Sequence, residues 1–321
     1  MIDMTNNKII VAGNQWFSKY LIEQLADVNI YPTLIINISP ENSSHISGYE
    51  DLKPLADKYN IQIYRPFNFG LNNEKDQNNL LSIPMDIMIV FGWQRLIPKW
   101  LIQHVKNGVF GVHGGPEKPP RCRGHAVFNW ALILGCQQFY MYLFQITERV
   151  DDGDIIDISE FSITPYDDIQ ILYHKNCIVS TRMILNNLQS LLDGSFSKNK
   201  QVGKPSYMPR RRPENGGIDW TWPVERIQNL IRALTPPYPG AYTKLNDLII
   251  KIYHGHIFDD KISFIGKPGE VLDVFPCGHF IVMTGDFPLY VKHFSYSGYN
   301  IIQKGIIFNE KCGIAIADPN Y

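Results

Sequence analysis

Short apolar runs alternate with segments of helical periodicity through the first half of the sequence. The first run is Lys8–Ala12, and the segment Trp16–Leu25 then repeats apolar residues at helical spacing. Later runs of the same kind are Thr33–Ile38, Ile61–Tyr64, Asp86–Phe91 and Val109–Val112. Runs that are apolar on both faces, with crossover helices between them, predict an α/β fold with a mostly parallel sheet covered on both sides. Ligands of such sheets bind beyond the carboxyl ends of the strands.

The chain is predicted to divide in two near residue 200. A helix at 124–134, strands at 139–146 and 155–161 and a long helix at 166–192 complete the first part. The polar stretch 195–206 then looks like an interdomain linker. Beyond it come a helix at 223–234 and short apolar runs at 248–253, 269–274, 279–284 and 289–294, which predict a small β-barrel or open sheet. We therefore predict an α/β domain at 1–200 and a smaller β-rich domain at 201–321.

The composition argues against several broad classes of protein. Hydrophobic residues make up 45% and charged residues 19% of the 321 residues, and no apolar stretch approaches the roughly 18–20 residues of a membrane span. The formal net charge of −1 lacks the basic excess that nucleic acid binding usually needs. Five scattered cysteines and the absence of a secretory leader pattern favour a reducing cytoplasm. We predict a cytoplasmic protein without a nucleic acid or membrane partner.

Several motifs of well-known chemistry are absent. The turn after the first run reads GNQWFS rather than G-x-G-x-x-G, so a dinucleotide pyrophosphate lacks its usual close backbone approach. Neither a P-loop nor a G-x-S-x-G elbow occurs. His254 and His256 share one face of a predicted strand, but the spacing suggests no third metal ligand. Two surface histidines are therefore a better interpretation than a zinc site, and no metal cofactor is predicted.

Two segments carry candidate chemistry. His113 ends a buried run and is followed by two glycines and a Pro-rich loop. There its imidazole can donate a proton or a hydrogen bond near neutral pH, or merely cap the strand. The segment Thr147–Asp154 is an acidic turn between two predicted strands. Asp151 in this turn can lie beside His113 and hold the ring charged or correctly oriented, although a solvated turn is the common alternative.

The motifs around these residues resemble those of the folate-dependent formyltransferases, whose pattern is N-x-H-x-S, then L-P-x-x-R-G, then D-x-G-D. The matching residues here are His113-Gly114-Gly115, Arg123-Gly124, Phe128-Asn129-Trp130 and Asp151-Asp152-Gly153-Asp154. The second domain is similar to the C-terminal domain shared by methionyl-tRNA formyltransferase and sugar N-formyltransferases, through Tyr207, 212–220, 230–234 and 238–241. The resemblance implies a Rossmann-like formyltransferase domain followed by an OB-like C-terminal domain.

This resemblance implies transfer of a formyl group from 10-formyltetrahydrofolate to a primary amine. His113 would then stabilise the oxyanion of the tetrahedral intermediate or shuttle the proton, Asp151 would keep the imidazole charged, and Asn129 is a further catalytic candidate. The flat pterin would lie between the loop after the fourth run and the loop before Asp151, where an apolar slot meets backbone donors and acceptors. The folate contacts expected there are Trp93, Arg95, Leu96, Ile97, Thr147, Glu148, Arg149 and Val150. Ordinary packing is the alternative for Trp93, Leu96 and Ile97.

The chain departs from the family pattern near the oxyanion. The family asparagine two residues before His113 is Gly111 here, and the family serine after it is Gly115. The loop before Arg123 is also longer. A backbone N–H of a turn at Gly114 and Gly115, the side chain of Asn129 or a bound water would have to replace the missing donor.

The acceptor amine is predicted from charge. A tRNA acceptor would demand a positive surface, whereas a nucleotide-linked amino sugar carries only a diphosphate, which one or two arginines can clamp. We therefore predict a dTDP- or UDP-linked 4-amino-4,6-dideoxy sugar, used for bacterial surface glycans such as the O-antigen of lipopolysaccharide. The substrate contacts expected are Gly114, Gly115, Arg121, Arg123 and His125, with loop anchoring as the alternative role of the arginines.

Two other functions remain open on the sequence. The chain can be a methionyl-tRNA formyltransferase, or a catalytically inactive folate-binding relative in which Gly111 marks the lost donor. Dimerisation through the C-terminal domain is expected by family analogy alone.

Overall fold

A computed structural model describes residues 7–44, 46, 48–297 and 302–313. These residues form two compact units, each made of separate stretches of the chain. Within the described residues, the first unit comprises those up to 124 with 140–161 and 174–206, and the second comprises 125–139, 162–173 and those from 207 onward. The polar stretch 195–206, expected as a linker, belongs to the first unit. The domain boundary at residue 200 stays a prediction.

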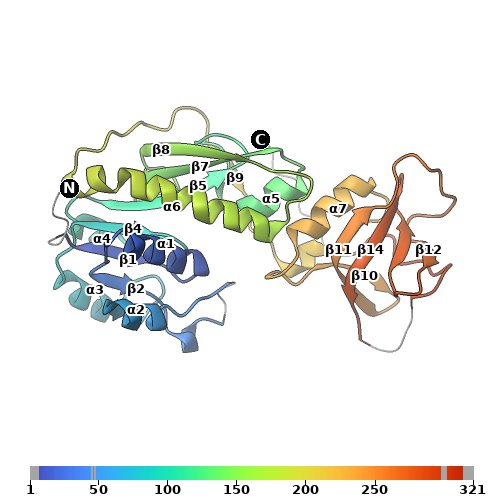
Figure 1. Ribbon diagram of the computed structural model, residues 1–321, viewed down its shortest axis with the longest axis horizontal. Coiled ribbons are helices and arrows are strands. Elements are labelled where there is room, and N and C mark those ends of the chain that lie inside the picture. The colour runs from blue at the N-terminus through green and yellow to red at the C-terminus, as the bar shows by residue number, and fades with distance from the viewer. Residues whose placement is uncertain (1–6, 45, 47, 298–301, 314–321) are drawn as a thin grey trace. The chain divides into compact units, whose positions relative to one another are not determined.

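The first unit is built on a mostly parallel sheet with the strand order β3-β2-β1-β4-β5-β7-β8 (Figure 1). The strands are β1 (Ile9–Ala12), β2 (Leu34–Ile36), β3 (Gln62–Tyr64), β4 (Ile87–Val90), β5 (Val109–Gly115), β7 (Gln138–Gln145) and β8 (Ile155–Ser162). The pairs from β3 to β5 are parallel, whereas β5 and β7 are antiparallel. The α/β prediction is confirmed, with an antiparallel step at β7.

Helices cover this sheet and bury its apolar strand residues. Ile10 pairs with Leu34 of β2 and Met88 of β4, and all three are fully buried in one apolar cluster. Leu80 and Leu101 belong to the same cluster, so the helices that carry them pack on this face of the sheet. The helices of the first unit are α1 (Trp16–Asp27), the 3₁₀ helix η1 (Pro40–Asn42), α2 (Lys53–Tyr59), α3 (Glu74–Leu81), α4 (Lys99–His104) and α6 (Ile169–Asp193), although residues 169–173 of α6 belong to the second unit.

The turn between β1 and α1 is tightly packed. A Cβ atom on Gly13 would lie 2.0 Å from Oγ of Ser18 and 2.4 Å from the carbonyl oxygen of Phe91, so only glycine fits. Oγ of Ser18 donates to that same carbonyl at 2.5 Å, and the N–H of Asn14 donates to the carbonyl of Gly92 at 3.1 Å. The turn after β1 therefore packs directly against Phe91 and Gly92 after β4, at the strand ends where a G-x-G-x-x-G protein holds its pyrophosphate.

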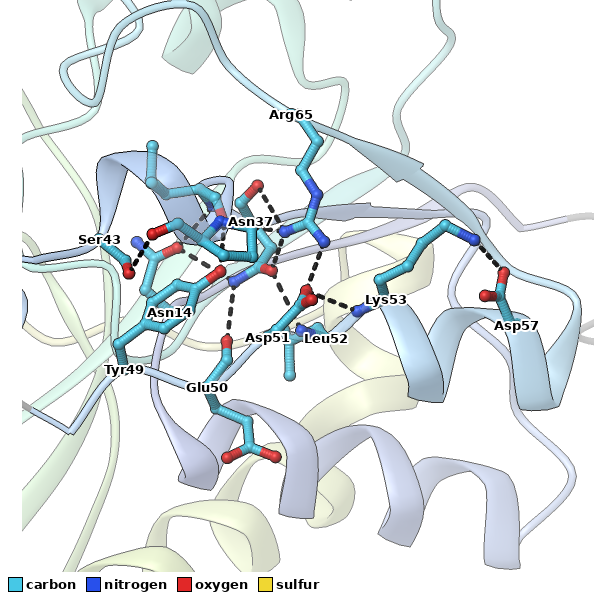
Figure 2. Close-up of polar contacts among 12 residues, drawn as sticks. Asn14, Asn37, Ser43, Tyr49, Glu50, Asp51, Leu52, Lys53, Asp57 and Arg65 are labelled. Atoms are coloured by element: carbon cyan, nitrogen blue, oxygen red, sulfur yellow. Dashed lines mark hydrogen bonds and ion pairs between the residues drawn. The ribbon is translucent and has the colours of Figure 1, made fainter.

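Polar side chains tie together the loops at the carboxyl ends of β1, β2 and β3 (Figure 2). Asn14 follows β1 and Asn37 follows β2, and both are completely buried. Oδ1 of Asn14 accepts hydrogen bonds from the N–H of Ile38 at 2.8 Å and from Nδ2 of Asn37 at 3.2 Å. Arg65, which follows β3, donates to Oδ1 of Asn37 and to the carboxylate of Asp51. These bonds fix the loop between β2 and α2 at the edge of the sheet where β4 also ends.

The second unit is built on an antiparallel sheet with the strand order β10-β11-β14-β13-β12. Its strands are β10 (Ala241–Leu245), β11 (Leu248–Ile257), β12 (Val271–Val274), β13 (Phe280–Met283) and β14 (Pro288–Ser295). Its helices are α5 (Val127–Ile133), the 3₁₀ helix η2 (Pro213–Gly216) and α7 (Val224–Ala233). Two very short strands complete the chain, β6 (Arg123–Gly124) in the first unit and β9 (Tyr207–Met208) in the second. The prediction of a β-rich C-terminal part is confirmed.

None of the helices in the described part of the chain combines the length and the apolar character that crossing a membrane requires.

Candidate active site

His113 lies near the carboxyl end of β5, on the antiparallel side of the sheet. It stands directly opposite Tyr142 of β7. The strand was expected to end at Val112, but pairing with β7 extends it to Gly115. Gly114 and Gly115 therefore continue β5 and do not form the turn that was expected to supply a backbone donor. The side chain of His113 is 14% exposed, so the imidazole is partly open to solvent.

Nε2 of His113 faces two oxygen atoms. The carbonyl oxygen of Cys122 is 3.2 Å away and Oδ2 of Asp151 is 3.6 Å away. Because a carbonyl oxygen can only accept, the hydrogen bond to Cys122 places a proton on Nε2. The carboxylate lies beyond hydrogen-bond length but within the range in which opposite charges attract. The structure thus brings together the two side chains that the sequence paired.

The turn that carries Asp151 depends on a close backbone approach. A Cβ atom on Gly153 would lie 1.6 Å from the carbonyl oxygen of Gln145, so no other residue fits. The N–H of Gln145 donates to the carbonyl of Asp154 at 3.0 Å and closes the connection between β7 and β8. Asp151 has a φ of +48°, in the left-handed region that aspartate tolerates better than most residues. Its Oδ2 accepts the N–H of Gly124 at 3.0 Å, which fixes the carboxylate.

Tyr142 packs edge to face against the ring of His113, with ring centroids 5.6 Å apart and planes at 73°. The residue is completely buried, and its hydroxyl makes no hydrogen bond with the described residues. Burial raises the pKa of Tyr142 well above its ordinary value, and the carboxylate of Asp151 raises it further. The phenol therefore stays neutral near pH 7. An unpaired buried hydroxyl costs free energy of folding, which makes this tyrosine unusual.

Gly111 leaves little room for the asparagine that the family pattern has two residues before His113. A Cβ atom on Gly111 would lie 2.9 Å from Cδ1 of Ile146 and 3.5 Å from Cε1 of Phe144. These are side-chain atoms of the neighbouring strand and its extension, so Ile146 occupies the space into which a longer side chain would grow. The absence of the family asparagine at position 111 therefore goes together with the presence of Ile146 in the space beside it.

Two predicted site residues, Asn129 and His125, lie in the second unit. Asn129 of α5 is buried, and its Nδ2 donates to the carbonyl of Ala233 at 2.8 Å. The side chain of His125 is exposed, and its backbone N–H donates to the carbonyl of Met208 at 3.4 Å. The amide of Asn129 is thus engaged within its own unit, and the site roles of both residues stay predictions.

The two arginines expected at the substrate are held by neighbouring side chains. Nε of half-buried Arg121 lies 3.4 Å from Oε2 of Glu117 in an ion pair. Arg123 is buried, and its Nη2 donates to Oε1 of Gln201 at 2.7 Å. Arg123 therefore anchors its loop, which is the alternative role that the sequence left open for the arginines. Arg121 is the more exposed of the two, and it is the stronger candidate for a substrate contact.

The residues predicted as folate contacts divide into a core group and an exposed group. Trp93 and Ile97 are buried in the core, as the packing alternative expected. Leu96 is 55% exposed and Val150 is 38% exposed. The side chain of Arg95 is exposed as well. The apolar side chains that remain open to a ligand in these two loops are thus Leu96 and Val150.

An ion pair joins α4, which follows the first of these loops, to the second loop at 147–150. Nζ of Lys99 lies 3.0 Å from Oε1 of Glu148. The second loop is also closed internally, because the buried carboxylate of Asp152 pairs with Nε of Arg149 at 2.5 Å and accepts a hydrogen bond from Thr147. The two loops predicted to flank the pterin are therefore neighbours in the first unit.

The histidine pair noted in the sequence lies on β11 of the second unit. The ring of His254 is 4.4 Å from that of His256 and 5.6 Å from that of His293, measured between centroids. Over the described ranges, no group of three or more His, Cys, Asp or Glu residues is arranged to hold a metal ion. Burial lowers the pKa of His254, and the neighbouring His256 and His293 lower it further. His254 is therefore neutral at pH 7.

Comparison with known families matches nearly the whole chain. Residues 8–186 match the model described as formyl transferase, and residues 211–310 match the one described as formyl transferase, C-terminal domain. The chain belongs to the formyl transferase family. The family that the motifs predicted is thereby confirmed, and the two matches together include His113, Asp151 and the seven-stranded and five-stranded sheets of this formyl transferase.

Individual relatives of this formyl transferase are more distant. The bifunctional polymyxin resistance protein ArnA of Wigglesworthia glossinidia brevipalpis is 29% identical over 278 residues, which are 86% of this chain and 41% of that protein. A variant of HypX from Aquifex aeolicus has a TM-score of 0.66 at 17% identity, over 91% of this chain and 45% of that one. The chain thus spans less than half the length of these two relatives.

An N-formyltransferase from Helicobacter canadensis, solved in complex with folinic acid and dTDP-3-aminofucose, is similar over its whole length. Its TM-score is 0.66 at 18% identity, over 90% of this chain and 100% of that one. At this identity the likeness shows a shared fold.

Replacing Tyr142 with phenylalanine should stabilise the protein. Tyr142→Phe keeps the packing against His113 and removes an unpaired buried hydroxyl, so we expect the free energy of unfolding to rise by about 1 kcal/mol. Urea unfolding of the two proteins measures the difference. Tyr142→Leu is the control, expected to lose stability because it leaves a cavity beside the imidazole. A lower stability of Tyr142→Phe would mean that the hydroxyl is paired in solution.

The lowered pKa of His254 makes stability depend on pH. The unfolded chain, whose histidine has an ordinary pKa of about 6.5, binds this proton more readily than the folded protein, so the free energy of unfolding falls as the pH drops below about 7. We expect His254→Asn to reduce the loss of melting temperature between about pH 7.5 and about pH 5.5. Thermal unfolding followed by circular dichroism measures that loss, and an undiminished loss in the variant would contradict the assignment.

Proposed function

We propose that this protein transfers a formyl group from 10-formyltetrahydrofolate to the amine of a nucleotide-linked amino sugar. The observation that carries the proposal is the placement of His113 beside Asp151, at the end of a central strand in a chain of the formyl transferase family. The ligands of the Helicobacter canadensis structure, folinic acid and dTDP-3-aminofucose, support both substrate classes.

Formyl transfer joins the acceptor nitrogen to the formyl carbon and breaks the bond from that carbon to N10 of the folate. The acceptor amine gives up a proton, N10 takes one, and negative charge develops on the formyl oxygen between the two events. An imidazolium at His113 would offer a donor to that oxygen or return the proton to N10. Asp151, whose Oδ2 lies 3.6 Å from Nε2, would orient the ring toward the substrate.

A reduced folate would bind between the loop after β4, at 92–97, and the loop before Asp151, at 147–150. Leu96 and Val150 offer exposed apolar surface for a flat heterocycle, and the loops offer backbone donors and acceptors. Nε1 of Trp93 is a buried donor without a partner among the described residues. In this proposal Trp93 and Ile97 support the binding surface from beneath, and Arg95, Thr147, Glu148 and Arg149 complete its polar rim.

The acceptor is proposed to be a dTDP- or UDP-linked 4-amino-4,6-dideoxy sugar for a bacterial surface glycan such as the O-antigen. The net charge of −1 disfavours tRNA, and Arg121 offers a cation for a diphosphate. We further propose a cytoplasmic enzyme that dimerises through its C-terminal domain.

Loss of either partner of the proposed pair should strongly reduce turnover without unfolding the protein. We expect His113→Ala and Asp151→Asn each to lower kcat by at least about 100-fold, because each removes a group that acts on the developing charge or proton. Asn at position 151 can still accept the N–H of Gly124, so the melting temperature should stay near that of the wild type. Release of tetrahydrofolate measures kcat, and His256→Ala in the second unit is the control. A loss of less than tenfold in either variant would remove that residue from the proposed chemistry.

A panel of acceptors identifies the substrate. Purified protein and 10-formyltetrahydrofolate are offered dTDP- and UDP-linked amino sugars, with product mass read for the sugar and absorbance read for the folate. We expect formylation of at least one nucleotide sugar. We expect no tight binding of initiator tRNA of the kind whose affinity falls steeply as the salt concentration rises. Formylation of methionyl-tRNA instead would establish the tRNA enzyme. Folate binding by calorimetry with background turnover on every amine would establish an inactive relative.

A further inference from the structure

We propose that Gln201 and Ser206, in the polar segment 199–206, are positioning residues that hold both partners of His113 in place. This inference rests on the proposed function, because it assigns these side chains a role in the same site. Neither residue needs to touch a substrate, since each acts through the backbone of the loops that carry Asp151 and Cys122.

Gln201 uses its side-chain amide to fasten the turn that carries Asp151. Nε2 donates to the carbonyl of Asp151 at 2.9 Å and to the carbonyl of Gly153 at 2.8 Å. Oε1 accepts from Nη2 of Arg123 at 2.7 Å. Both amide hydrogens and the amide oxygen of Gln201 are thus in hydrogen bonds. The two N–H groups bind the backbone on either side of Asp152. Gln201 therefore holds Asp151 in its left-handed conformation through a hydrogen bond to the carbonyl of that residue.

Ser206 does the same for the loop that carries Cys122. Its Oγ accepts the N–H of Cys122 at 3.0 Å, and its carbonyl accepts the N–H of Arg123 at 2.9 Å. Cys122 is completely buried and has a φ of +62°, which is uncommon for a residue with a side chain. Its carbonyl is the oxygen that Nε2 of His113 faces. Ser206 thus fixes the peptide that orients the imidazole.

The segment is held by hydrogen bonds rather than by apolar packing. Asn199 exchanges two backbone hydrogen bonds with Ile155, at 2.7 and 2.8 Å, where β8 begins. Val202 is 85% exposed, so it adds little burial to the segment. The side chains of Gln201 and Ser206 form hydrogen bonds with the two loops beside His113. The segment is therefore better explained as a support of the site, here called the brace, than as a spacer between domains.

The brace matters because the geometry at His113 is demanding. A misplacement of about 1 Å in a catalytic group can cost about 100-fold in rate. Without Gln201 the turn at Asp151 loses two of the bonds that oppose relaxation of its left-handed residue. The carboxylate would then leave its place beside the imidazole, whereas Leu96 of the loop after β4 and Arg121, which pairs with Glu117, make none of these hydrogen bonds. Loss of the brace should therefore lower kcat more than it raises KM.

The test compares Gln201→Met with Lys200→Met, which changes the exposed neighbour in the same segment. Methionine keeps the length of glutamine and removes all three hydrogen bonds. We expect Gln201→Met to lower kcat by about 10- to 100-fold with KM for both substrates changed by less than about threefold, and Lys200→Met to behave as the wild type. Gln201→Glu keeps the acceptor for Arg123 but lacks both donors, so it should not restore kcat.

Hydrogen exchange followed by mass spectrometry provides a readout that does not need activity. Peptides covering 147–155 should exchange faster in Gln201→Met than in the wild type, and those covering β1 and β2 should not. Ser206→Ala is the milder second variant, expected to speed exchange at 120–125. If Gln201→Met does not fold, Ser206→Ala carries the same test.

The outcomes separate this inference from the proposed function. Wild-type kcat in Gln201→Met, full activity in Gln201→Glu or unchanged exchange at 147–155 would each overturn the brace. Faster exchange in Gln201→Met with an inactive wild type would support the brace and reject the proposed reaction. An equal loss of kcat and of folate binding would also overturn it, because that pattern indicates a general structural role.

Discussion

The candidate active site depends on one close backbone approach, that of Gly153 to Gln145. With a Cβ atom only 1.6 Å from the Gln145 carbonyl, no other residue allows β7 and β8 to close at this point. Closure here leaves residues 147–152 projecting from the strand ends, and it sets Asp151 in a left-handed conformation. Gly153 of the D-x-G-D motif is thus required because any side chain would clash with Gln145, whereas Asp151 places its carboxylate beside His113.

Sequence reasoning found the two residues that face each other but missed what holds them. The pairing of His113 with Asp151 was inferred because His113 ends an apolar run, because Asp151 lies in the turn between two predicted strands, and because the family motifs contain both residues. The roles of Gln201 and Ser206 leave no such signal, because a side chain that bonds backbone groups far along the chain has no periodicity or spacing of its own. The extension of β5 to Gly115 was likewise invisible, because it depends on pairing with β7.

Other differences have equally local causes. Crossover helices were predicted between the parallel strands, but the bounds of α2, α3 and α4 were not. Helix α3 shows why: it reads EKDQNNLL, with only two apolar residues to reveal a periodicity. Trp93 follows a strand and a glycine, as a ligand-stacking residue would, yet it belongs to the apolar cluster beneath the sheet. Ile146 occupies the space beside Gly111 into which the family asparagine would extend, and this contact between neighbouring strands has no signature in the sequence.

Several energetically costly features of the first unit lie close to His113. Cys122 and Asp151 are left-handed residues with side chains, and the hydroxyl of Tyr142 and Nε of Arg123 are buried without partners among the described residues. Each such feature costs of the order of 1–3 kcal/mol and would relax if folding alone were at stake. The two left-handed residues persist because hydrogen bonds from Gln201 and Ser206, distant in sequence, hold the two loops that carry them. A site that must meet charge developing on a substrate gains from this, because its groups are then oriented before the reaction and need not reorganise during it.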